Sequence, residues 1–113
     1  MYVSVTGLKT NGIVGWFRFW VLAVPALQAA KRAPGLQFVS TKVRHGTHHT
    51  LTVWTSKEDM MAYRRGKAHR RAMKVFSQIA TGRVLGFESD DRPSWEEALA
   101  RYDRDAREVG ARG

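Results

Sequence analysis

Residues 36–55 constrain the fold most, because they form two alternating, β-rich runs on either side of a glycine. We predict a hairpin turn at Gly46-Thr47, since glycine supplies the positive φ that a two-residue turn needs. That register gives four cross-strand pairs: His45 with His48, Val43 with Thr50, Thr41 with Thr52, and Val39 with Trp54. Both faces of the hairpin are then half apolar, so its sheet requires cover on both sides.

The remaining elements alternate with this hairpin in one domain, 1–113. We predict a strand at 2–9, a helix at 15–33 that is kinked or broken at Pro25, a helix at 56–79 broken near Gly66, a strand at 82–88, a helix at 94–108 and a flexible tail at 109–113. The order β-α-β-β-α-β with an added C-terminal helix predicts an α+β, ferredoxin-like fold. Too few helices remain to cover both faces of the sheet, so a second copy of the chain is the simplest cover. We therefore expect a homodimer.

Composition narrows the classes of function. The chain has no cysteine, which excludes disulfides, thiolate nucleophiles and cysteine-built metal sites. Its net charge of +9 is uneven, with +11 in residues 1–82 and −2 in residues 83–113. A basic body favours an anionic ligand, nucleic acid or a membrane surface, or serves solubility alone. The apolar run 19–27 is too short to span a bilayer, and we expect a cytoplasmic protein.

Four motifs together resemble one known group. They are APG at 33–35, HTLTVWTS at 49–56, MMAYRRGKAHRRAM at 60–73 and PSWEEA at 93–98. The chain resembles the antibiotic-biosynthesis-monooxygenase-like dimeric α/β-barrel superfamily, and within it a branch of spheroidene-monooxygenase-like and uncharacterised bacterial proteins. The resemblance covers roughly residues 2–107. It implies a homodimer whose two sheets face each other, with a ligand pocket in each protomer between the sheet and its helices.

The resemblance implies several activities, because fold does not fix function. Members include cofactor-free oxygenases of aromatic polyketides, haem-degrading enzymes, isomerases and proteins without known activity. The haem-degrading pattern has an asparagine on the first strand, a tryptophan and a helix histidine. This chain departs from it: Asn11 lies past the first strand, Tyr63 stands at the tryptophan position, and His69 comes about one turn early. The cofactor therefore stays open, as none or haem.

His69 and Tyr63 are the predicted catalytic residues. Turned toward the sheet, His69 is a candidate general base near neutral pH or an axial metal ligand. The alternative is a histidine with a purely structural hydrogen bond. Tyr63 offers a phenol donor to a flat ligand, and plain core packing is its alternative.

The predicted substrate-binding residues are mostly aromatic. They are Trp54, Trp16, Trp20, Phe17, Met73 and Arg64. The aromatic side chains would form the pocket wall, or pack as ordinary core. The first helix could instead lie on a membrane surface, and its aromatic residues could form a dimer surface.

The basic run 64–74 is the other candidate surface. Arg64, Lys67 and Arg71 fall on one side of a helix, where they could hold phosphates or guide a carboxylate substrate. The alternative is a solvated helix face. Nucleic acid is not the expected partner, because no nucleic-acid-binding motif is present. We predict no metal site, since His45 and His48 alone give too few ligands for zinc.

These observations predict a homodimer that binds a small apolar or aromatic molecule. If it is an enzyme, we expect monooxygenase-like oxidoreductase chemistry, either cofactor-free or with haem. Two alternatives stay open. One is a haem-binding protein with His69 as axial ligand. The other is a non-enzymatic module that binds anionic partners through the basic helix 57–78.

Overall fold

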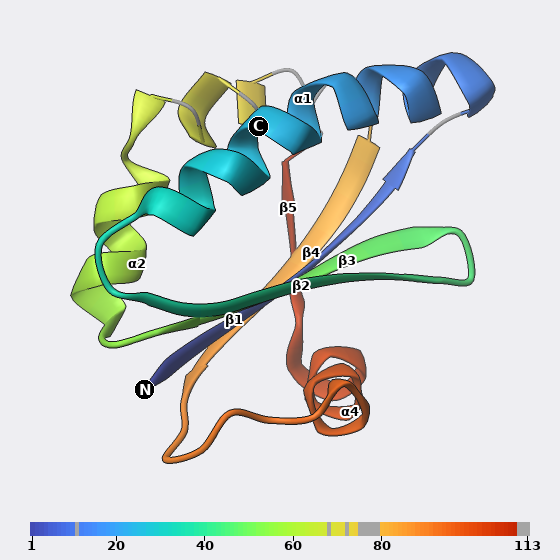
Figure 1. The fold of residues 1–113 in the computed structure, drawn as a ribbon. Coiled ribbons are helices and arrows are strands. Elements are labelled where there is room, and N and C mark those ends of the chain that lie inside the picture. The colour runs from blue at the N-terminus through green and yellow to red at the C-terminus, as the bar shows by residue number, and fades with distance from the viewer. Residues whose placement is uncertain (11, 68, 72, 75–79, 111–113) are drawn as a thin grey trace.

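A computed structural model describes residues 1–10, 12–67, 69–71, 73–74 and 80–110. One five-stranded antiparallel sheet organises them, with strand order β2-β3-β1-β4-β5 (Figure 1). The strands are β1 Tyr2–Thr10, β2 Leu36–Arg44, β3 Thr47–Trp54, β4 Ala80–Glu88 and β5 Arg107–Gly110. The labelled helices are α1 Gly12–Arg32, α2 Lys57–Arg64 and α4 Trp95–Asp105. The first four strands have the predicted ferredoxin-like order, and the sheet does not close on itself within the chain.

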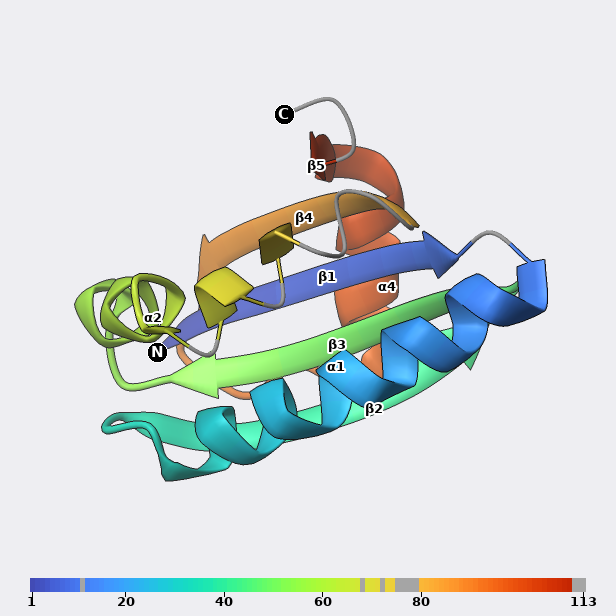
Figure 2. The same cartoon turned by 90° about the horizontal axis from the view of Figure 1, so that it is seen from above.

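The sheet has helices on both faces. Figures 1 and 2 show α1 and α2 over one face, and α4 against the other. The core beneath α4 joins β1, β3 and the helix: Val3, Val5, Leu51, Val53, Ala98 and Tyr102. The expectation that too few helices remain to cover both faces is therefore wrong, because the amphipathic C-terminal helix folds back onto this one.

The hairpin turn lies one residue earlier than predicted. Arg44 pairs with Thr47, so His45 and Gly46 form the turn, with φ of 52° and 76°. Two positive φ values match the type I′ turn that suits the twist of a hairpin. All four predicted pairs are wrong by two residues on one strand; Val43, for example, faces His48. Because side chains alternate with period two, this shift leaves the residues from Phe38 onward on their predicted faces. Leu36 is the exception, because a register irregularity before Phe38 pairs it with Trp54 and turns it to the opposite face.

The C-terminal region differs from its predicted form. Ser94 begins α4 with a capping box, in which its hydroxyl accepts from the Glu97 N–H at 3.1 Å. The helix ends at Asp105 rather than 108, and residues 107–110 form an edge strand on β4. The predicted flexible tail is thus strand at 109–110, while residues 111–113 lie outside the described part of the chain.

Two helices carry the other predicted irregularities. The first helix, α1, continues through Pro25 without a break. The second stops at Arg64, and helical residues resume at Lys67 after Gly66, as predicted. Its predicted last residues, 75–79, are outside the described residues. None of the helices that the structure describes is both long and apolar enough to cross a bilayer.

Candidate functional site

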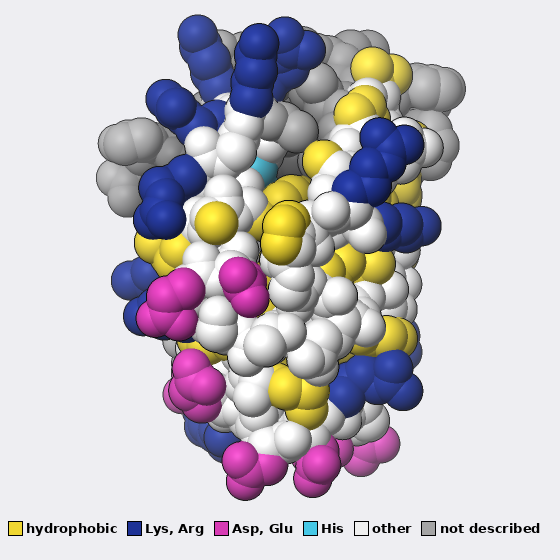
Figure 3. Space-filling view, turned by 60° about the vertical axis from the view of Figure 1, so that its left-hand side comes forward, with side chains coloured by type: hydrophobic (Ala, Val, Ile, Leu, Met, Phe, Trp, Pro, Cys, Tyr) yellow, Lys and Arg dark blue, Asp and Glu magenta, His cyan; other side chains and the backbone are white. Residues whose placement is uncertain are grey.

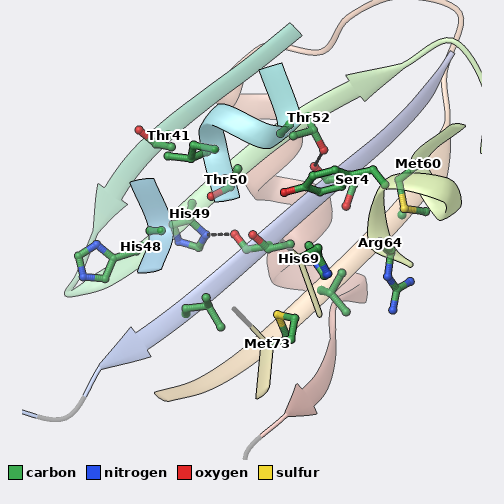
Figure 4. Close-up of a pocket in the computed structure, with 18 of the residues that line it drawn as sticks. Ser4, Thr41, His48, His49, Thr50, Thr52, Met60, Arg64, His69 and Met73 are labelled. Atoms are coloured by element: carbon green, nitrogen blue, oxygen red, sulfur yellow. Dashed lines mark hydrogen bonds between the residues drawn. The ribbon is translucent and has the colours of Figure 1, made fainter. Parts of the chain in front are cut away.

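A cavity of about 340 Å³ lies between the sheet and the helices α1 and α2 (Figure 4). Its walls are mainly apolar and aromatic. They include Tyr2, Leu8, Trp20, Ala23, Leu27, Ala30, Trp54, Met60, Tyr63, His69, Met73 and Val84. Its volume falls at the lower end of the range of about 300–1,000 Å³ that is usual for small-molecule sites.

The floor of the cavity is a patch of hydroxyl groups on three neighbouring strands. Ser4 and Thr6 come from β1, Thr50 and Thr52 from β3, and Thr41 from β2. They are adjacent because Ser4 pairs with Thr52, and Thr6 with Thr50. Each hydroxyl both donates and accepts hydrogen bonds, so the floor suits a ligand with oxygen substituents. These residues were not among the predicted site residues, although Ser and Thr recur at every second position in 4–6 and 50–52.

One wall is a continuous run of aromatic rings. Trp54 ends β3, and its ring centroid lies 5.4 Å from that of Tyr63 on α2. Tyr63 in turn contacts His69 edge-on at 5.2 Å. The Trp54 side chain is 1% exposed, and its indole Nε1 has no hydrogen-bond partner among the described residues. The wall therefore offers a ligand aromatic surface for packing.

His69 is held in its neutral form by its surroundings. Burial lowers the pKa of its imidazole, and the positive charge of Arg64 lowers it further. The backbone of Arg64 opposes these two effects and raises the pKa. A neutral imidazole has a nitrogen lone pair that is available as a base or ligand.

Tyr63 keeps its proton at neutral pH. Burial raises the pKa of its phenol, so the hydroxyl remains a hydrogen-bond donor. The structure thus brings three predicted residues, Trp54, Tyr63 and His69, into one wall, and Met73 also lines the cavity. Arg64 stands at the α2 end beside them.

The opposite end of the cavity is closed by the first helix. Trp20 lines it and packs edge-on against His48, with ring centroids 5.5 Å apart. The side chains of Trp16 and Phe17, also predicted to line the pocket, lie outside what the structure describes. Burial lowers the pKa of His48.

The three histidines of the hairpin do not converge. His45 is exposed in the turn, His48 belongs to the cavity side, and His49 lies on the face under α4. The predicted opposition of His45 and His48 is wrong because of the two-residue shift in register. Within the described residues, no group of three or more histidines or carboxylates is placed to hold a metal ion.

His49 is part of a second cluster that the sequence did not reveal. Its ring is 1% exposed and contacts Tyr102 of α4 edge-on at 4.9 Å, while Nδ1 lies 3.3 Å from the Thr6 carbonyl oxygen. Gly7 leaves the space that the Tyr102 ring occupies. Through this cluster, α4 packs against the sheet.

Comparison with known proteins identifies the fold. No family model matches the chain, and no curated protein matches it. Among solved structures, a putative antibiotic biosynthesis monooxygenase from Nitrosomonas europaea superposes with a TM-score of 0.72 at 9% identity, over 80% of this chain and all of that one. The chain has the antibiotic biosynthesis monooxygenase fold.

Two further structures agree. A putative antibiotic biosynthesis monooxygenase from Deinococcus radiodurans has a TM-score of 0.71 at 14% identity, covering 83% of this chain and 97% of its own. SnoaB, a cofactor-independent oxygenase from Streptomyces nogalater, has a TM-score of 0.68 at 12% identity, covering 83% of this chain and 95% of its own. The resemblance seen in the sequence is thus confirmed for the fold.

Proposed function

We propose that this protein binds a compact, oxygen-substituted aromatic or apolar molecule and oxidises it in a monooxygenase-like reaction. The cavity carries this proposal, because an aromatic wall, a hydroxyl floor and a neutral histidine meet in it. SnoaB is a cofactor-independent oxygenase of the same fold, which supports the choice of chemistry.

His69 acts as the general base in this proposal. A neutral imidazole takes a proton from an activated ring CH₂, leaving a carbanion that O₂ can oxidise. The overall reaction converts the CH₂ group and O₂ into a ring ketone and water. The aromatic wall holds the ring in place, and hydroxyl groups of the floor bind its oxygen substituents.

Oxygen uptake with anthrone, which has such a CH₂ group, tests this reaction. We expect the wild-type protein to consume O₂ faster than the protein-free solution. His69→Gln should slow the catalysed rate by a factor of about 10² or more. His45→Gln makes the same change in the exposed turn and should retain the full rate. Equal rates for wild type and His69→Gln would remove His69 from the reaction.

Haem binding with His69 as axial ligand is a second candidate. The lowered pKa of His69 keeps its imidazole neutral, as a metal ligand must be. The cavity volume favours a smaller molecule than a porphyrin. Titration with haemin distinguishes the two candidates: a sharp Soret band that His69→Ala abolishes would favour haem, and an unchanged spectrum would exclude it.

We also propose a homodimer, which rests on the resemblance to a dimeric superfamily. The face that carries α4 keeps partly exposed aromatic rings, on which arginines lie: Arg92 on Phe38 and Arg101 on Phe87, each 4.2 Å from the ring centroid. Light scattering on the full chain measures the assembly mass directly. A mass of twice 12.8 kDa supports the dimer, and a mass of 12.8 kDa overturns it.

A further inference from the structure

The cavity is one-sided in charge. Four of its described lining residues are cationic: Lys42, Arg64, Arg83 and Arg107. None of the lining residues that the structure describes is Asp or Glu. Walls of one charge sign in a low-dielectric setting concentrate ligands of the opposite sign.

Arg64 is the cation best placed to meet a ligand. Arg83 is already engaged, since its Nη2 donates to the Ala106 carbonyl oxygen at 3.0 Å and its guanidinium lies 5.3 Å from the Tyr102 ring centroid. Among the described residues, the hydrogen bond of the Arg64 side chain is a weak one, at 4.0 Å, to the Met61 sulfur. Arg64 is exposed at the cavity mouth, next to His69 (Figure 4).

No acidic residue near Arg64 in the sequence neutralises it. Residues 60–87 contain no Asp or Glu. The two ion pairs among the described residues, Arg44 with Asp103 and Arg104 with Asp105, involve other arginines. The acidic residues of α2 lie in its first turn, whereas Arg64 is in its last.

The surface view agrees with this distribution. Figure 3 shows Lys and Arg side chains gathered at one end of the face, with a histidine and hydrophobic side chains visible in the hollow beside them. The exposed cations of the adjoining segment are Arg65, Lys67, Arg70, Arg71 and Lys74. The field of Arg64 lowers the pKa of His69, and the same field favours a negative ligand group at this end.

We propose that the ligand of this cavity is an amphipathic carboxylate, with its aromatic or apolar body against the Trp54–Tyr63 wall and its carboxylate on Arg64. This inference rests on the proposed function, because it names the class of molecule that the same cavity takes. The planar guanidinium can donate two parallel hydrogen bonds to a carboxylate. An anion at Arg64 also offsets the positive charge that surrounds the cavity mouth.

A pair of probes with one skeleton tests the proposal: 2-naphthoate, which is anionic at pH 7.5, and neutral 2-naphthamide. Calorimetric titration of the full-length protein should give a lower Kd for naphthoate by about tenfold or more. Arg64→Gln should remove this preference while leaving the affinity for naphthamide unchanged. Arg65→Gln, a neighbour that does not line the cavity, is the matched control and should keep the preference.

The outcomes separate this inference from the proposed function. Equal binding of both probes to the wild type overturns the carboxylate and leaves an aromatic-binding cavity. Failure of both probes to bind overturns the proposed function, in which the cavity binds an aromatic molecule. Equal loss of naphthoate affinity in Arg64→Gln and Arg65→Gln means that general surface charge attracts the anion, which contradicts a site on Arg64. Displacement of naphthoate by a short DNA duplex assigns the basic segment to nucleic acid and also contradicts the proposal.

Discussion

The Tyr63 ring stands edge-on to the His69 imidazole, with planes at 70° and ring centroids 5.2 Å apart. Trp54 lies on the other side of Tyr63, inclined at 32°. The wall of the cavity is therefore built from the end of β3, from α2 and from the segment after Gly66. A substitution that removes the Tyr63 ring therefore alters both the packing against Trp54 and the environment of His69.

Removing the Tyr63 ring should expose His69. Tyr63→Ala is expected to cost about 2 kcal/mol of unfolding free energy, less than a fully buried aromatic residue, because Tyr63 is half-buried. It should also raise the pKa of His69 toward its usual value, since burial is the main cause of the lowered pKa. Tyr63→Phe keeps the ring and should preserve that pKa. Urea unfolding and NMR titration of the imidazole measure the two effects, and an unchanged His69 pKa in Tyr63→Ala would contradict the account.

Removing the charge of Arg64 should raise the His69 pKa as well. Arg64→Gln eliminates the positive charge that disfavours the protonated imidazole. The same NMR titration measures this, with Arg65→Gln as the control that should move the pKa less. Binding of 2-naphthoate should raise the His69 pKa in the same direction by supplying a negative charge. A wild-type His69 pKa above the usual 6.5 or so would be incompatible with the buried position.

Acid should destabilise the protein through His49. Burial lowers the pKa of His49 in the folded state, so the unfolded state binds more protons once the pH falls below about 6.5. The unfolding free energy therefore decreases as the pH falls from about 6.5 to the folded-state pKa of His49. Above about pH 6.5, burial of the neutral imidazole costs no stability through this effect. His48 and His69 act in the same direction. His49→Leu should reduce the loss of stability between pH 7.5 and 5.5, measured by urea unfolding; an identical loss in variant and wild type would refute this.

A methyl group at Gly7 should disturb the packing of α4 against the sheet. A Cβ there would overlap the hydroxyl and ζ-carbon of Tyr102, and we expect Gly7→Ala to cost about 1–3 kcal/mol. The cost should be smaller in a Tyr102→Phe background, because the hydroxyl is the nearest atom. Thermal or urea unfolding of the four proteins forms a double-mutant cycle. Full additivity of the two changes would mean that α4 does not lie over Gly7.

The ion pair between Arg44 and Asp103 ties the tip of β2 to α4. Arg44 Nη1 donates to Asp103 Oδ2 at 3.1 Å and Nη2 to Oδ1 at 2.6 Å. Both side chains are partly exposed, so Asp103→Asn should cost only about 0.5 kcal/mol at low salt and less at 1 M salt. The Arg44 hydrogen bond lowers the pKa of Asp103, so this stability is present above the usual carboxyl pKa and is lost as the pH falls through the lowered one. A loss that does not depend on salt would argue against the ion pair.

Local patterns predicted four of the five strands, the helix starts near residues 56 and 94, and the candidate grouping of Trp54, Tyr63 and His69. Period-two alternation fixes the face of each residue, so the two-residue error in the hairpin left the faces correct from Phe38 onward. The turn itself was ambiguous, because one glycine fits two positions and His45 tolerates a positive φ.

Contacts between distant segments were not predictable in this way. The C-terminal helix itself was predicted, but not that it would dock on the face of Val3 and Val5. That docking depends on the space at Gly7, on Tyr102 and on the burial of His49, which come from three separate elements. Four residues, 107–110, are also too short to show the alternation of a strand.

The most direct test of the account is whether the cavity binds a neutral aromatic molecule. The indole N–H of Trp54, assigned with Trp54→Phe, is followed by NMR while 2-naphthamide is added. The account predicts a saturable shift with a Kd of about 1 mM or tighter. It also predicts loss of that shift in Ala23→Leu, which fills the cavity from α1. The absence of a saturable shift in the wild type, or an equal shift in a folded Ala23→Leu, would contradict it.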